Sequence, residues 1–152
     1  MSSKNMRVSA SLRIVSKAFT AKEIGAVLGT TTAKAFEVGE RMSRRNPKSA
    51  VRDAAIWILD AHAPDNTPIE AHLGHLADFV DAHLGQLLEL AEKSSFDYWC
   101  ALSFVDNDGQ GGIALPSSLL ARLLRIPASI VLDVYYPSGR EDEGRDGGDT
   151  SI

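Results

Sequence analysis

The residues best suited to chemistry in this chain form a short polar turn between two apolar segments. The turn reads Asp106-Asn-Asp-Gly-Gln-Gly-Gly112 and follows an apolar run that ends at Val105. Carboxylate and amide oxygens ligate hard cations, and glycines let a ligand approach the backbone. Asp and Asn also close structural turns with their own side chains. The turn is therefore either a metal site built on Asp106 and Asp108 or a chain reversal, and we favour the reversal.

Two standard ion-binding motifs do not fit this turn. A calcium loop of the EF-hand type carries a glutamate at its twelfth position, whereas the twelfth residue counted from Asp106 is Ser117. A phosphate-binding loop ends in Gly-Lys-Ser/Thr, and Gly109-Gln-Gly-Gly112 lacks that ending. Two functional interpretations of the turn remain: a looser cation site, and a surface contact for a ligand or partner.

Three histidines lie on a predicted helix. His72 and His75 are three residues apart, so both rings could reach one metal ion. His83 would lie about 16 Å from His72 along the axis, at a rise of ~1.5 Å per residue, which is too far to share an ion. No cysteine or acidic ligand completes a zinc motif at a recognisable spacing. We interpret these histidines as solvent-facing residues or residues at the edge of the apolar stripe.

Basic residues cluster in one polar segment. The cluster comprises Arg41, Arg44, Arg45, Lys48 and Arg52. Such a cluster could bind an anion or an acidic partner, although it could also be a solvated loop. Nucleic acid is an unlikely partner, because no aromatic residues are interleaved and the chain carries a net charge of −4.

Nucleophilic catalysis has little support in the sequence. Cys100, the single cysteine, falls on the apolar side of a predicted strand, where a thiol usually serves as packing. There is no Gly-x-Ser-x-Gly motif, and neither a catalytic triad nor a carboxylate pair can be recognised from spacing. We therefore predict no catalytic residue and no cofactor, and we lean against an enzyme.

Composition bounds the class of protein. A chain of 152 residues with 44% hydrophobic and 24% charged residues fits one globular domain with its own core. The single cysteine and the absence of a signal-like or membrane-spanning apolar run favour a cytoplasmic location. We expect the domain to cover residues 1–136. Residues 137–152 contain two arginines and five acidic residues, and they predict a flexible acidic tail.

The strands that must position these groups are visible as alternating patterns. Residues of one parity are all apolar over 6–14, 96–105 and 130–136, and the polar residues of these segments fall on the other parity, the period of half-buried strands. Residues 54–60 are apolar at nearly every position, which favours a strand covered on both faces or inside the sheet. Residues 30–38 predict a weaker extended segment.

Helix starts are marked by two capping boxes, Thr20-Ala-Lys-Glu23 and Thr67-Pro-Ile-Glu70. The second precedes an apolar stripe from Ile69 to Ala91, which predicts one long helix. A third helix is expected between Pro116 and Pro127. The order of elements predicts an α+β domain: a single, mostly antiparallel sheet with helices packed on one face. Two β-α-β halves flanking the long helix give a faint hint of a pseudo-repeat.

Several of these segments resemble one bacterial family, domain of unknown function 4279. The resemblance covers roughly residues 7–136 and rests on Ala10-Ser-Leu-Arg-Ile14, the helix from Thr20 to Gly29, Trp57-Ile-Leu, the helix from Pro68, and the run from Asp106 to Leu120. Where relatives carry Ser-Pro at the start of the last helix, this chain has Pro116-Ser117. The resemblance implies a single intracellular α+β domain and brings no activity, cofactor or catalytic residue.

The function expected from the sequence is therefore protein binding by a small non-enzymatic module, of which an immunity-type protein that masks a toxin is one form. Its partner would be another protein or a second copy of the chain, contacted through open sheet edges or the basic segment. Two alternatives remain: a metal- or anion-dependent enzyme using Asp106 and Asp108, and a weak nucleic-acid binder using Arg41 to Arg52.

Overall fold

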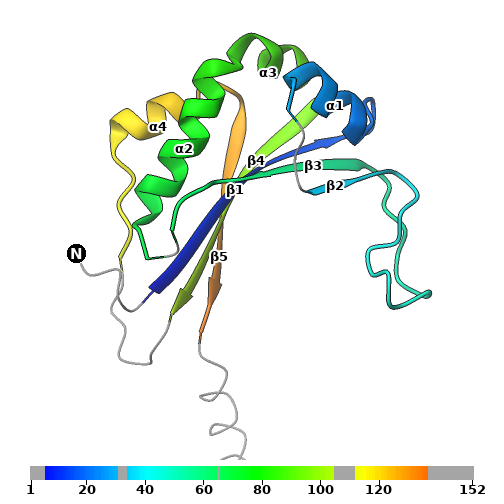
Figure 1. The fold of residues 1–152 in the computed structure, drawn as a ribbon, viewed down its shortest axis with the longest axis horizontal. Coiled ribbons are helices and arrows are strands. Elements are labelled where there is room, and N and C mark those ends of the chain that lie inside the picture. Colours follow the sequence, from blue (N-terminus) through cyan, green and yellow to red (C-terminus); the bar gives the residue numbers. More distant parts are fainter. Residues whose placement is uncertain (1–5, 31–33, 65, 105–111, 137–152) are drawn as a thin grey trace, which may run out of the picture.

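A five-stranded sheet forms the centre of the molecule in the computed structural model, which describes residues 6–30, 34–64, 66–104 and 112–136 (Figure 1). The strands and helices follow in the order β1 (Met6–Ser16), α1 (Ala21–Leu28), β2 (Lys34–Phe36), β3 (Ala55–Asp60), α2 (Ile69–Ala82), α3 (Leu84–Ala91), β4 (Ser94–Phe104), α4 (Ser117–Leu123) and β5 (Ala128–Tyr135). The predicted strand at 54–60 is confirmed as β3, and in the described part of the weak segment at 30–38 the strand is the short β2.

The sheet has the strand order β2-β3-β1-β4-β5. β1 pairs antiparallel with both β3 and β4, β2 pairs antiparallel with β3, and β5 alone pairs parallel, with β4. The predicted single, mostly antiparallel sheet of an α+β domain is confirmed. The two β-α-β halves differ, however: β3 lies between β1 and β2, whereas β5 lies directly beside β4.

Alternation along the central strand decides which face becomes the core. Val8, Ala10, Leu12 and Ile14 of β1 are buried, and the odd-numbered Arg7 and Ser9 are exposed. β4 follows the same rule, with Phe96, Tyr98, Cys100 and Leu102 buried. The antiparallel register places Leu12 opposite Tyr98 and Ala10 opposite Cys100, so the two apolar rows share one face.

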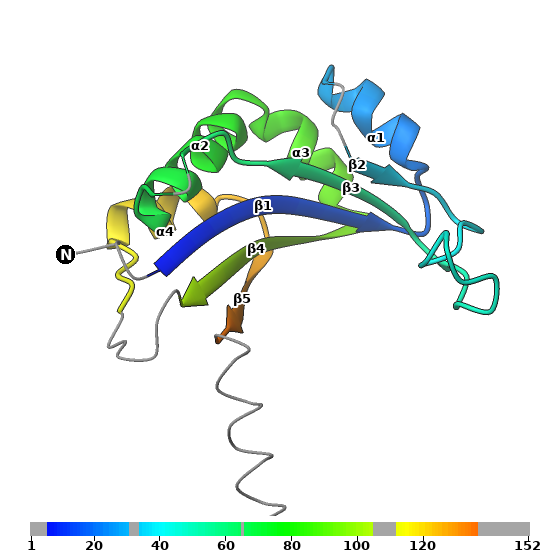
Figure 2. The same cartoon turned by 60° about the horizontal axis from the view of Figure 1, so that its bottom comes forward.

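All four described helices cover this apolar face and leave the other face of the sheet uncovered (Figure 2). The core they close contains large side chains that are almost fully buried: Leu12, Ile14, Ile24, Trp57, Leu73, Leu76, Leu87, Tyr98 and Leu123. Helices on one face of a mixed sheet are the arrangement that the order of elements predicted.

Helix α1 begins as the sequence predicts. The backbone N–H of Glu23 donates to the Thr20 hydroxyl at 3.0 Å, and the Thr20 N–H donates to the Glu23 carboxylate at 2.9 Å. These two bonds are the reciprocal pair of a capping box. Gly29 ends the helix in the left-handed region, at φ 63°, which glycine adopts without a side-chain clash.

The second predicted capping box is wrong. Helix α2 begins at Ile69 without a side-chain cap, because the Thr67 hydroxyl is used elsewhere. This hydroxyl donates to the Pro64 carbonyl at 2.6 Å and lies 3.1 Å from Nε2 of the buried His72. The capping-box residues are present, but the contacts of the Thr67 hydroxyl with Pro64 and His72 leave it without a bond to the first amides of α2.

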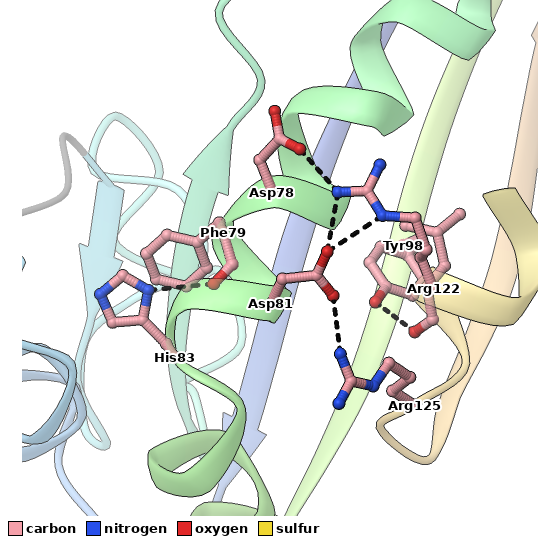
Figure 3. Close-up of polar contacts among 8 residues, drawn as sticks. Asp78, Phe79, Asp81, His83, Tyr98, Arg122 and Arg125 are labelled. Atoms are coloured by element: carbon pink, nitrogen blue, oxygen red, sulfur yellow. Dashed lines mark hydrogen bonds and ion pairs between the residues drawn. The ribbon is translucent and has the colours of Figure 1, made fainter.

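The predicted long helix is two helices. The backbone of His83 leaves the helical region, at φ −123° and ψ 23°, and α3 starts at the next residue. The His83 ring stacks on Phe79 with centroids 4.1 Å apart, and Nδ1 bonds the Phe79 carbonyl at 3.0 Å (Figure 3). The bend lets Leu87 and Leu90 of α3 pack into the core where α3 contacts α1 and β4.

Helix α4 is fastened to α2 and β4 by polar contacts (Figure 3). Arg122 bonds Asp78 at 2.6 Å and Asp81 at 2.8 Å, and Arg125 bonds Asp81 at 3.1 Å. The hydrogen bond from Arg122 is the main reason that the pKa of Asp81 lies below its usual value. Because these side chains are largely exposed, water screens the pairs and their contribution to stability is small.

The Tyr98 hydroxyl makes a buried contact with the same helix. It donates to the Leu123 carbonyl at 2.5 Å, and the Tyr98 side chain is fully buried. We predict that Tyr98→Phe lowers the free energy of unfolding by about 1–3 kcal/mol, because it leaves a buried carbonyl without its donor. Urea denaturation measures the change. Tyr135→Phe, which removes an exposed hydroxyl bonded to Asp133, is the control and should unfold like the wild type. An unchanged midpoint for Tyr98→Phe would contradict the assignment.

Candidate functional site

The basic segment of the sequence forms a two-stranded projection, residues 37–53, which we call the basic hairpin. It extends from the end of the sheet formed by β2 and β3 (Figures 1 and 2). Backbone bonds hold its two arms together: Gly39 N–H to the Arg52 carbonyl at 2.9 Å, Arg52 N–H to the Glu40 carbonyl at 2.8 Å, and Met42 N–H to the Ala50 carbonyl at 2.9 Å. The segment predicted as a polar loop therefore has ladder-like pairing.

The tip of the basic hairpin is closed by side chains. The Lys48 N–H donates to the Asn46 side-chain oxygen at 3.0 Å, a turn in which an Asn side chain replaces a backbone acceptor. The Ser49 hydroxyl donates to the Ser43 carbonyl at 3.1 Å, and it accepts from the Ser43 N–H at the same distance. These bonds give the tip a defined shape.

The five basic residues are divided between two roles. Arg41 donates to the Ser49 carbonyl at 3.0 Å, and the Arg52 guanidinium lies 4.2 Å from the centroid of the Phe36 ring. These two side chains brace the hairpin. Arg44, Arg45 and Lys48 are exposed around the tip and present positive charge to the solvent. Arg41 is exposed as well, but its guanidinium is bonded within the hairpin, so three of the five predicted candidates present their charge to the solvent without bracing the hairpin.

Sequence reasoning missed the apolar side chains that accompany these charges. Val38 and Met42 are each 58% exposed, and Val51 is 50% exposed. The signal was present in the sequence, because these residues interrupt a polar segment without any helical or strand period that would bury them. Exposed apolar side chains beside positive charges are typical of surfaces that bind proteins.

Glu37 anchors the hairpin to helix α1. Its carboxylate accepts from the Ala21 N–H at 2.7 Å and from the Lys22 N–H at 3.2 Å, the first free amides of that helix. A carboxylate is favoured there by the partial positive charge at a helix N-terminus. The Glu37 N–H in turn bonds the Glu40 carboxylate. The base of the hairpin is thus fixed to the core through α1.

The predicted metal candidates are not assembled by the described residues. Asp106 and Asp108 lie outside the described ranges, so a site built on them stays a prediction. His72 is buried, 2% exposed, whereas His75 is exposed, so these two histidines do not face one site. No group of three His, Cys, Asp or Glu side chains that could hold a metal ion occurs in the part of the chain that the structure describes.

The comparisons with known proteins point to one family. The model of the family described as Domain of unknown function (DUF4279) matches residues 6–137, which include every described strand and helix. No curated protein and no solved structure matches the chain significantly. Within the described ranges, no helix has the length and apolar character needed to cross a membrane.

Cys100 is placed where its thiol should be inert. The side chain is fully buried in β4, and burial raises the pKa of the thiol from 9.0 to about 11. We predict that iodoacetamide does not modify folded protein at neutral pH and modifies it readily in urea, as mass spectrometry would record. A cysteine at the exposed position 129, introduced as Ser129→Cys, is the control and should react in the folded protein.

The raised pKa of Cys100 also makes the stability of the folded protein depend on pH. The unfolded chain ionises this thiol at a lower pH than the folded chain, so the contribution of Cys100 is complete below pH 9 and is lost as the pH rises toward 11. Rapid alkylation of Cys100 in the folded state would contradict both statements.

Proposed function

We propose that this chain, which belongs to the DUF4279 family, is a non-enzymatic protein-binding module whose basic hairpin docks onto an acidic protein surface. The observation that carries the proposal is the pairing of exposed apolar and cationic side chains on one defined projection. Val38, Met42 and Val51 supply apolar area, and Arg44, Arg45 and Lys48 surround the tip with positive charge.

The mixed character of the hairpin favours a protein over a nucleic acid. A nucleic-acid surface would be dominated by phosphate contacts and by aromatic side chains that stack on bases. Residues 37–53 contain no aromatic side chain, and the chain carries a net charge of −4. An apolar patch flanked by carboxylates would match both the valine and methionine side chains and the positive rim.

The bonds within the hairpin lower the entropic cost of binding. Ordering a loop on association costs free energy, and a loop already fixed avoids that cost. The arms are paired through the backbone, Asn46 and Ser49 close the tip, and Glu37 ties the base to α1. Immunity-type masking of a toxin is one instance of such binding, since it too requires a preformed surface.

The proposal predicts that removing two charges at the tip weakens partner binding at least tenfold. The variant is Arg44→Ala/Arg45→Ala, and the control, Arg7→Ala/Lys93→Ala, removes the same charge from exposed positions away from the hairpin. Proteins captured from a nuclease-treated host lysate by wild type and control would be identified, purified and titrated against all three by calorimetry. Binding should also weaken with salt, because charged rims are screened.

Three results would contradict this use of the hairpin. They are capture of proteins from an untreated lysate that is lost when the lysate is treated with nuclease, equal affinity of the purified partner for the tip variant and the wild type, and loss of affinity in the control variant alone.

A second mode of binding, self-association of two copies of the chain, is supported by a different observation, the exposed edge strand β5. It is eight residues long, carries one charged residue, Asp133, and exposes Leu132 at 49% and Val134 at 41%. Edges are usually protected by lysine, proline or a very short strand. An antiparallel pair of β5 strands centred on Leu132 would place Asp133 opposite Val131 of a second copy, so no like charges would meet.

Self-association through this edge predicts a dimer that Leu132→Lys dissociates. The inserted charge would have to be buried opposite its own copy, which is unfavourable. Analytical ultracentrifugation at several protein concentrations measures the effect. Leu88→Lys changes an equally apolar, 44% exposed residue on α3 and should leave the dimer intact. A monomeric wild type at all concentrations would exclude this mode.

A further inference from the structure

A cavity of about 500 Å³ lies between helix α1 and strands β2 and β3. Its size falls within the roughly 300–1,000 Å³ that small-molecule sites occupy. The walls are built mainly from residues with a methyl group or no side chain: Ala21, Gly25, Ala26, Gly29 and Ala35. Because these small residues project little into the cavity, a planar ligand can lie against them.

Just beneath the floor of the cavity lies a hydrogen-bond donor. Trp57 of β3 is 1% exposed, and its Nε1 has no hydrogen-bond partner among the described residues. A buried N–H without an acceptor is unfavourable, so such groups call for an explanation. The opposite side of the indole is packed, with the Phe79 ring centroid 6.1 Å away. The indole Nε1–H of Trp57 therefore lies on the side that faces Gly25 of α1.

Gly25 controls the approach to this donor. A Cβ atom added at Gly25 would lie 3.5 Å from Trp57 Nε1 and 3.2 Å from the Thr30 carbonyl oxygen. Because Gly25 has no side chain, the layer of atoms between the solvent and the indole N–H is thinnest there. Because Nε1 has almost no accessible surface, an acceptor atom reaches it only if α1 moves slightly away from β3.

Two charged side chains of opposite sign, Lys22 and Glu37, line the cavity, so together they favour a ligand without net charge. The first amides of α1, which would otherwise attract a phosphate, already bond the Glu37 carboxylate. Each Glu37 oxygen retains a lone pair that can accept a further bond. A ligand that enters here meets the Lys22 ammonium and, once α1 has moved slightly, Trp57 Nε1 as donors, and the Glu37 carboxylate as an acceptor.

We propose that this cavity binds an uncharged, planar nitrogen heterocycle. A ring nitrogen or carbonyl oxygen of the ligand accepts from Trp57 Nε1, and an N–H of the ligand donates to the Glu37 carboxylate. The flat walls contact the two faces of the ring. The site shares Glu37 with the base of the basic hairpin but needs no protein partner.

Adenine is the probe, because it is planar, uncharged and carries both an acceptor and a donor. Binding is followed by fluorescence in a Trp99→Phe background, which leaves Trp57 as the single tryptophan. Benzoate, a planar anion, and benzene, a planar ring without hydrogen-bonding groups, are the comparison probes. We expect adenine to change the Trp57 emission saturably, and the other two to bind at least tenfold more weakly.

Two variants locate the binding. Gly25→Ala narrows the approach to Nε1, and Ala35→Leu fills the cavity from the β2 side; each should weaken adenine binding at least tenfold. Gly74→Ala is the control, because it places the same methyl group on helix α2 where nothing lies within 4 Å. Circular dichroism checks that every variant is folded.

Each remaining result overturns the proposal. These are no change in emission up to millimolar adenine, equal binding of benzene, or full adenine binding by both folded cavity variants. Because the experiment contains no protein partner, its failure would leave protein binding by the basic hairpin untouched, and the reverse also holds.

Discussion

The rest of the structure depends on burial of the alternating apolar side chains of β1. This strand is central and pairs with both β3 and β4, so its parity sets the parity of its neighbours. A shift of one residue in either pairing would turn Leu12 and Ile14 toward solvent and unpack every helix. All four described helices cover that single face and leave the opposite face uncovered, and β2 and β5 form the two edges of the sheet. The surfaces available for binding are consequences of that one-sided core.

The basic hairpin and the cavity lie at one end of the molecule, and one residue contacts both. Glu37 follows β2, starts the basic hairpin, caps α1 and borders the cavity beneath that helix. Its carboxylate accepts from the first amides of α1, in the place that an anion would otherwise take, and this contact fixes the base of the hairpin. Occupation of the cavity and engagement of the hairpin would therefore act on the same anchor, although each can be tested alone.

The other end of the molecule is held differently. The Arg122 and Arg125 contacts to α2 are exposed and contribute little, whereas the Tyr98 hydroxyl satisfies a buried carbonyl at the end of α4. Secure placement of α4 allows the chain to return as β5, parallel to β4, at the edge of the sheet. Cys100 is buried in the middle of β4, and its raised pKa disfavours the thiolate form that a nucleophile needs. Packing contacts dominate this end, and the proposed binding surfaces lie at the opposite end and on the sheet edge.

By itself, the sequence determined the α+β class, the buried faces of β1 and β4, the family resemblance and the cap of α1. Each depends on neighbours a few residues apart, such as Thr20 with Glu23 or alternate residues of β1. Tertiary structure alone decided the parallel β4–β5 pair and the helix break at His83. It also decided that Glu37 caps a helix sixteen residues earlier in the chain and that Arg41 and Arg52 brace the hairpin. The reason is physical: local patterns record burial and short-range hydrogen bonds, whereas strand order and side-chain competition are settled only when distant segments meet.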